Sequence, residues 1–114
     1  MENMKKVFEE TNLNLEKFSK EFPKEMEAFG KFMHAIEEPG ALDSKQNELI
    51  AIALSVATHC RWCIALHVEK ALEVGCKRKE ILEACWMAVL MGGGPSLMYM
   101  QLVEKALEDF ETKK

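Results

Sequence analysis

The sequence predicts an all-α fold, built as a single domain of about six helices over residues 1–114. Strong helix formers (Ala, Leu, Glu, Lys, Met and Gln) supply 63 of the 114 residues, whereas Val, Ile and Thr supply only 14. Three prolines and six glycines leave few breaks, and three of those glycines are consecutive. This composition excludes an all-β domain and disfavours an α/β sheet.

The charge balance argues against two classes of partner. The chain has 15 basic and 19 acidic residues, a net charge of −4 and a pI near 5.4. Phosphate backbones and anionic membrane surfaces are poor partners for such a protein. The N-terminus has no apolar signal-peptide core, and no apolar run approaches the roughly 18 residues of a membrane span. We expect a cytoplasmic protein that binds neither nucleic acid nor membrane.

The N-terminal part, residues 1–40, is expected to form a pair of amphipathic helices. The first helix is mostly charged, with apolar residues spaced along it. Pro23 can occupy the first position of the second helix. The second helix carries apolar residues at spacings of three and four and ends near Pro39. Those residues are Met26, Phe29, Phe32, Met33 and Ile36. His34, on the same helix, is expected at the surface or in an interface.

The next two helices are expected to form a central antiparallel hairpin. The third begins near Asp43 or Ser44, because either side chain can cap its first free amides, and it extends to Ala57. In the short junction that follows, Thr58 is a candidate cap for the fourth helix. That helix is expected to end at Gly75, which adopts the left-handed conformation readily.

The fifth helix is expected over about residues 79–91 and the sixth from Pro95 to about Phe110, with three glycines at positions 92–94 between them. The third helix and the second half of the fifth are apolar on every face, so they need cover on all sides. Six helices in one small subunit do not supply that cover. We therefore expect a homo-oligomer whose interfaces take up part of this surface.

The clearest chemical motif is the Cys-x-x-Cys pair at Cys60 and Cys63. Two sulfurs one helical turn apart can close a disulfide with little backbone movement. A helix N-terminus stabilises a thiolate, and by this argument alone Cys60 would be the more acidic of the two. His67 follows Cys63 by one turn on the same face, where an imidazole can take the thiol proton.

An acidic residue completes a possible proton relay. If the helix hairpin turns near residues 58–59, Glu48 lies level with about residue 69, which is within one turn of His67. A carboxylate in that place could orient the imidazole and stabilise its protonated form.

The same cysteines could instead form part of a zinc site in a non-enzymatic helical scaffold. Cys60, Cys63 and His67 supply at most three ligands from one helix, so a fourth has to come from elsewhere in the chain or from another subunit. The candidates in the chain are His59, Cys76 and Cys85. The chain has no second Cys-x-x-Cys pair, so no metal is expected. A c-type haem is excluded, because Ile64 stands where that motif requires histidine.

The two remaining cysteines are expected to differ in exposure. Cys85 lies in the apolar half of the fifth helix and is expected to be a small buried hydrophobe. Cys76 directly follows Gly75 and is expected to be exposed, with no partner beside it in the sequence.

The motif resembles the signature of the alkylhydroperoxidase D-like branch of the carboxymuconolactone decarboxylase family. It consists of a glutamate, eleven intervening residues, the cysteine pair, three more residues and a histidine, namely Glu48, Cys60, Cys63 and His67. The glycines at 92–94, followed by Pro95 and Tyr99, are similar to the family's glycine-rich turn between its last two helices. The resemblance covers about residues 42–105, the expected family core.

The resemblance implies an all-helical subunit that assembles into trimers or hexamers and reduces peroxides with its thiols. By this similarity Cys63 would attack the peroxide and His67 would accept its proton, with Glu48 supporting His67 through water. Cys60 would then attack the resulting sulfenic acid and form the disulfide. A dithiol or thioredoxin-like donor would reduce that disulfide, and no cofactor is implied.

One departure from the family pattern concerns the residue before the second cysteine. The best-studied branch has a histidine there, whereas this chain has Trp62, as many relatives have an aromatic residue. The resemblance therefore leaves open whether the oxidant is a peroxide or a disulfide. A lyase of the decarboxylase branch is the alternative enzyme. It does not need a cysteine pair and would require a basic pocket, for which Arg61 and Arg78 are the only arginines.

Overall fold

The computed structural model describes residues 1–111 and confirms the all-α prediction, since none of these residues forms a strand. The six helices are α1 (Met4–Glu21), α2 (Pro23–Glu37), α3 (Ser44–Ala57), α4 (Arg61–Glu73), α5 (Arg78–Gly92) and α6 (Gly94–Glu111). Each lies within a few residues of its predicted place. Within residues 1–111, no helix combines the length and the hydropathy that crossing a membrane requires.

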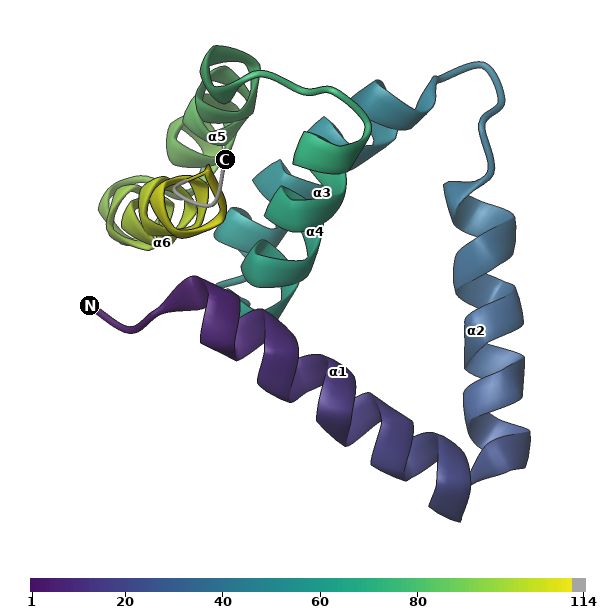
Figure 1. The fold of residues 1–114 in the computed structure, drawn as a ribbon. Coiled ribbons are helices and arrows are strands. Elements are labelled where there is room, and N and C mark those ends of the chain that lie inside the picture. Colours follow the sequence, from purple (N-terminus) through teal and green to yellow (C-terminus); the bar gives the residue numbers. More distant parts are fainter. Residues whose placement is uncertain (112–114) are drawn as a thin grey trace.

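The core lies between α3, α4, α5 and α6, with the first turn of α1 closing one side (Figure 1). Small and β-branched side chains dominate it, so the helices approach closely. Its fully buried members include Ile52, Val56, Ile64, Val68, Ile81, Cys85, Val103 and Leu107. The hairpin of α3 and α4 is central to this bundle, as the helix lengths predict.

Helix α1 is attached to the bundle by its first turns. Met4 and Val7 are buried there, and the backbone N–H of Met4 donates to Oδ2 of Asp109 on α6 at 2.7 Å. The rest of α1 runs outward to a sharp turn at Phe22, where α2 begins (Figure 1).

Helix α2 stands away from the bundle (Figure 1) and buries none of its residues. Its apolar side chains are exposed, with Phe29 at 54%, Phe32 at 61% and Ile36 at 61% of their full accessible surface. The amphipathic pattern predicted for this segment therefore forms a helix, but the subunit leaves most of its apolar side exposed. His34 is exposed on the same helix, as expected for a surface or interface residue.

The helices of the hairpin have different N-cap residues, Asp43 for α3 and Cys60 for α4. Asp43 caps α3 through a capping box, in which its carboxylate accepts the N–H of Gln46 at 2.8 Å and the Gln46 side chain accepts the N–H of Asp43 at 2.9 Å. The expectation that Thr58 caps α4 is wrong. Thr58 belongs to the end of α3, where its hydroxyl donates to the carbonyl of Leu54 at 2.8 Å, and Cys60 is the N-cap of α4.

The junction between α3 and α4 depends on a histidine in a glycine-like conformation. His59 has φ of 57°, a left-handed backbone that costs a non-glycine residue roughly 1–2 kcal/mol. It allows the N–H of Cys60 to bond the carbonyl of Ser55 at 3.0 Å, which reverses the chain after α3. The His59 ring stacks on the Tyr99 ring of α6 at 4.5 Å between centroids. This stack holds the residue that precedes the first cysteine.

The glycine-rich turn is tighter than the sequence suggests. Of its three glycines only Gly93 lies outside a helix, with φ of 70°, since α5 includes Gly92 and α6 starts at Gly94, one residue before the predicted Pro95. A Cβ at Gly92 would lie 2.2 Å from Oγ of Ser96, so any other residue there would force the Ser96 side chain to move.

Candidate functional site

The two motif cysteines form a disulfide at the start of α4. Cys60 and Cys63 are bonded through their sulfurs, with Cα atoms 5.2 Å apart, and both side chains are half-buried. Cys60 is the N-cap, so its Sγ also accepts the backbone N–H of Cys63 at 3.2 Å. A thiolate on Cys60 in the reduced protein would be stabilised by the same amide and by the helix dipole.

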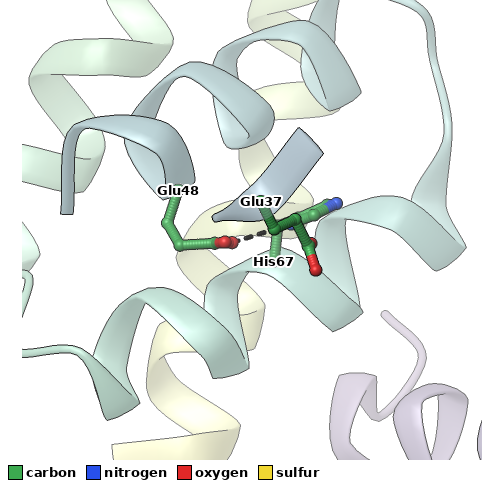
Figure 2. Close-up of side chains that lie close together, drawn as sticks. All are labelled: Glu37, Glu48 and His67. Atoms are coloured by element: carbon green, nitrogen blue, oxygen red, sulfur yellow. Dashed lines mark hydrogen bonds and ion pairs between the residues drawn. The ribbon is translucent and has the colours of Figure 1, made fainter. Parts of the chain in front are cut away.

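The relay residues meet across the helix hairpin. Nδ1 of His67 on α4 lies 2.8 Å from Oε1 of Glu48 on α3 (Figure 2). Glu48 is 7% exposed, so this buried carboxylate has its main polar partner in the imidazole. The resemblance implied support through water, and this expectation is wrong, because the two side chains are in direct contact. The predicted hairpin places about residue 69 level with Glu48, whereas the residue that contacts Glu48 is His67, two residues earlier.

Helix α4 carries the cysteine pair and the imidazole on successive turns. Cys63 and His67 are four residues apart, so their side chains lie on one face of the helix. In the disulfide state neither sulfur holds a proton. The contact with Glu48 fixes the orientation of the imidazole in this state.

A cleft of about 330 Å³ opens onto the relay residues. Helix α2 forms one wall through Met33 and Ile36, and α3 forms the other through Ile50 and Leu54. These walls are apolar, whereas Asn47, His67 and two glutamates supply the polar groups. An alkyl chain fits such walls better than a charged ring does.

Both arginines are engaged away from this cleft. Arg61 pairs with Glu2 at 3.2 Å and its guanidinium lies 4.5 Å from the centre of the Trp62 ring, which is 51% exposed beside the disulfide. Arg78 pairs with Glu104. Neither arginine lines the cleft, so the basic pocket that the decarboxylase alternative requires does not form beside His67.

The other cysteines do not extend the site. Cys85 is fully buried, as predicted, and burial raises the pKa of its thiol to about 12. The expectation of an exposed Cys76 is wrong. It is 4% exposed and its Sγ lies 3.6 Å from the carbonyl oxygen of Lys45, because the left-handed Gly75 folds the chain back over the start of α3.

A second acidic residue, which no sequence motif indicated, lies beside Glu48 and His67. It is Glu37, the last residue of α2 (Figure 2). These three residues are the one group of carboxylate, histidine or cysteine side chains within residues 1–111 that could hold a metal ion, and the group contains no cysteine. No sequence spacing links α2 to this group, because the approach depends on how α2 returns to the bundle.

Comparisons with known proteins agree with this fold and motif. The carboxymuconolactone decarboxylase family profile matches residues 23–104. A Legionella pneumophila protein of this family is 43% identical, with a TM-score of 0.86 over 96% of this chain and 95% of that one. A Thermotoga maritima member, for which a role in the antioxidative response has been suggested, is 26% identical, with a TM-score of 0.83 over 92% and 90%.

A relative with a named activity matches over a shorter region. The alkyl hydroperoxide reductase AhpD of Mycobacteroides abscessus is 33% identical over 64 residues, which is 56% of this chain and 36% of that protein. The family profile covers well over half of the chain, and its match includes every residue of the site. The chain is a member of the carboxymuconolactone decarboxylase family.

Proposed function

We propose that this protein is a thiol-dependent peroxidase and disulfide oxidoreductase that reduces alkyl hydroperoxides. The observation that carries the proposal is the Cys60–Cys63 disulfide at the start of α4, with the hydrogen-bonded pair of His67 and Glu48 on the following turn. The similarity to an alkyl hydroperoxide reductase and the apolar cleft beside His67 support it. The absence of an arginine from the cleft lining disfavours a lactone carboxylate as substrate.

The proposed cycle begins with the reduced protein. His67 takes the proton of the Cys63 thiol, and the thiolate attacks the terminal oxygen of the hydroperoxide. The O–O bond breaks, Cys63 becomes a sulfenic acid, and the leaving alkoxide takes the proton from His67 and departs as an alcohol. Glu48 stabilises the protonated imidazole during this step.

Cys60 then closes the cycle. Its thiolate attacks the sulfenic sulfur of Cys63, and the hydroxyl group leaves with a proton as water, giving the disulfide seen in the structure. An external dithiol or thioredoxin-like donor attacks the sulfur of Cys63, and Cys60 is the leaving thiolate, stabilised by the N–H that it accepts. The second thiol of the donor then attacks the donor sulfur of this mixed disulfide, so that Cys63 leaves as a thiolate and the donor becomes a disulfide. The donor supplies two electrons per peroxide. Such donors are kept reduced in the cytoplasm, where we place the protein.

The direct test is a free-thiol count on anaerobically reduced protein before and after one equivalent of an organic hydroperoxide. We expect rapid loss of two of the four thiols and a Cys60–Cys63 linkage in the peptide map. Cys76 and Cys85 should remain free, because both are buried and burial raises the pKa of each thiol. Four remaining thiols, or slow and scattered losses, would contradict a peroxide-specific pair.

We also propose that the protein functions as a homo-oligomer, a trimer or a hexamer. The support comes from large apolar side chains that the subunit leaves uncovered on three helices. They include Phe29 and Phe32 of α2, Leu54 of α3, and Leu90 and Met91 of α5. Leu90 and Met91 are 72% and 83% exposed, which a stable isolated subunit rarely tolerates on this scale.

Light scattering after size exclusion tests the assembly. We expect a mass of three or six times the 13.0 kDa subunit. The double variant Phe29→Glu/Phe32→Glu should shift the mass toward one subunit, because it places carboxylates in an apolar contact. Lys31→Glu, between them on the same helix and 79% exposed, is the matched control and should leave the mass unchanged. A monomeric wild-type protein would contradict the proposal.

A further inference from the structure

Three side chains from three helices converge at the mouth of the cleft. Glu37 ends α2, Glu48 lies on α3 and His67 lies on α4 (Figure 2). One ligand atom from each, two carboxylate oxygens and one imidazole nitrogen, lies within 4.8 Å of the other two. From this geometry we infer a binding site for a divalent transition-metal ion formed by Glu37, Glu48 and His67.

The donor set suits such an ion. Zn²⁺ and Mn²⁺ accept mixed imidazole and carboxylate ligands, whereas Mg²⁺ and Ca²⁺ prefer oxygen alone. Donor atoms around one Zn²⁺ lie roughly 3.4 Å apart, given metal–ligand distances of about 2.1 Å. The atoms of Glu48 and His67 are already 2.8 Å apart, so binding requires the Glu37 carboxylate to shift by ~1–2 Å.

Charge also favours a cation at this place. Within residues 1–111, the lysine or arginine paired with these glutamates is Lys70, whose ammonium lies 2.8 Å from Oε2 of Glu37. That ion pair is solvent-accessible, with side chains 40% and 34% exposed, so it contributes little and can be exchanged. Lys70 can then turn into solvent. Three protein ligands would leave further coordination positions for water or another ligand.

A bound ion would also affect the redox cycle, an effect that rests on the proposed function. An ion bound to Nδ1 of His67 would leave the imidazole proton on Nε2, the nitrogen that otherwise accepts the proton of Cys63. Bound Zn²⁺ should therefore slow the oxidation of the reduced protein. The binding itself does not depend on the redox cycle, because no cysteine belongs to the three-residue site.

Isothermal titration with ZnCl₂ tests the site. The fully oxidised protein is used, because its Cys60 and Cys63 are joined and its other two cysteines are buried. We expect one Zn²⁺ per subunit, with the affinity lowered about tenfold or more in Glu37→Gln. Glu38→Gln is the matched control, because it removes the same charge from the neighbouring exposed residue outside the group.

No Zn²⁺ binding to the oxidised wild-type protein, or equal binding by Glu37→Gln and Glu38→Gln, would overturn the site. The inhibitory role has a separate readout in the reduced protein. There, the rate at which hydroperoxide oxidises each variant is measured without and with Zn²⁺, and the first rate is divided by the second. This ratio should be smaller for Glu37→Gln than for Glu38→Gln. Zn²⁺ binding without slower oxidation would support the metal site, but it would contradict the role of His67 as proton acceptor in the proposed function.

Discussion

Replacing Cys63 with serine should abolish peroxide turnover, with a loss of at least about 10³-fold in the rate of hydroperoxide consumption. A serine hydroxyl is scarcely ionised near neutral pH and cannot form a sulfenic acid, so the nucleophile and the oxidised intermediate are lost together. The half-buried side chain of Cys63 tolerates the isosteric change, and circular dichroism should show an intact helical fold. The measurement is hydroperoxide consumption coupled to a dithiol donor.

Replacing Cys60 should give a different defect from replacing Cys63. Cys60→Ser retains the attacking thiol, so we expect one equivalent of hydroperoxide to be consumed and the reaction to stop at a sulfenic acid on Cys63. A sulfenic-acid probe such as dimedone should label that residue, and mass spectrometry detects the adduct. If dimedone labels Cys60 in Cys63→Ser instead, the order of the two cysteines in the cycle is reversed.

Cys76→Ser is the matched control for both variants. It makes the same chemical change at a buried cysteine outside the pair, where a hydroxyl can donate to the carbonyl of Lys45 as the thiol does. We expect turnover within about twofold of the wild type, since nothing in the cycle uses Cys76. An equally large loss in this control would show that the losses at the pair come from damage to the fold.

The features that the sequence predicts correctly depend on local or near-local interactions. Asp43 caps α3 through contacts within four residues. The contact between Glu48 and His67 follows from a hairpin whose junction is three residues long, which leaves little freedom in how α3 and α4 pair. The predicted level, residue 69, differs from the actual partner His67 by two residues, about half a helical turn.

The features that it does not predict depend on packing between distant segments. Nothing local indicates that His59 adopts the left-handed conformation, because the stabilising stack with Tyr99 involves a residue 40 positions later. Cys76 is buried by the start of α3, and Glu37 reaches the relay only through the path of the chain between α2 and α3. Spacing within one helix contains no information on such contacts.

Removing the imidazole of His67 should also have a large effect on the reaction rate. His67→Gln should lower the rate of hydroperoxide oxidation at pH 7 by about 10²-fold. Without the imidazole the thiolate forms only by ionisation in water, which for an unperturbed cysteine occurs near pH 8.5. The rate of the variant should therefore rise nearly tenfold per pH unit up to about pH 8.5, whereas that of the wild type should change little over the same range.

Glu48→Gln separates orientation from charge in the relay. Glutamine has nearly the same shape and its carbonyl can still accept from Nδ1 of His67, so the imidazole stays in place, but the charge that stabilises its protonated form is lost. We expect a rate loss smaller than that of His67→Gln, with a pH profile shifted in the same direction. Glu38→Gln, which removes an exposed carboxylate away from the imidazole, should retain the wild-type profile. A structural role for Glu48 alone would lower thermal stability without moving the profile, so the two measurements together distinguish a relay residue from a buried hydrogen-bond partner.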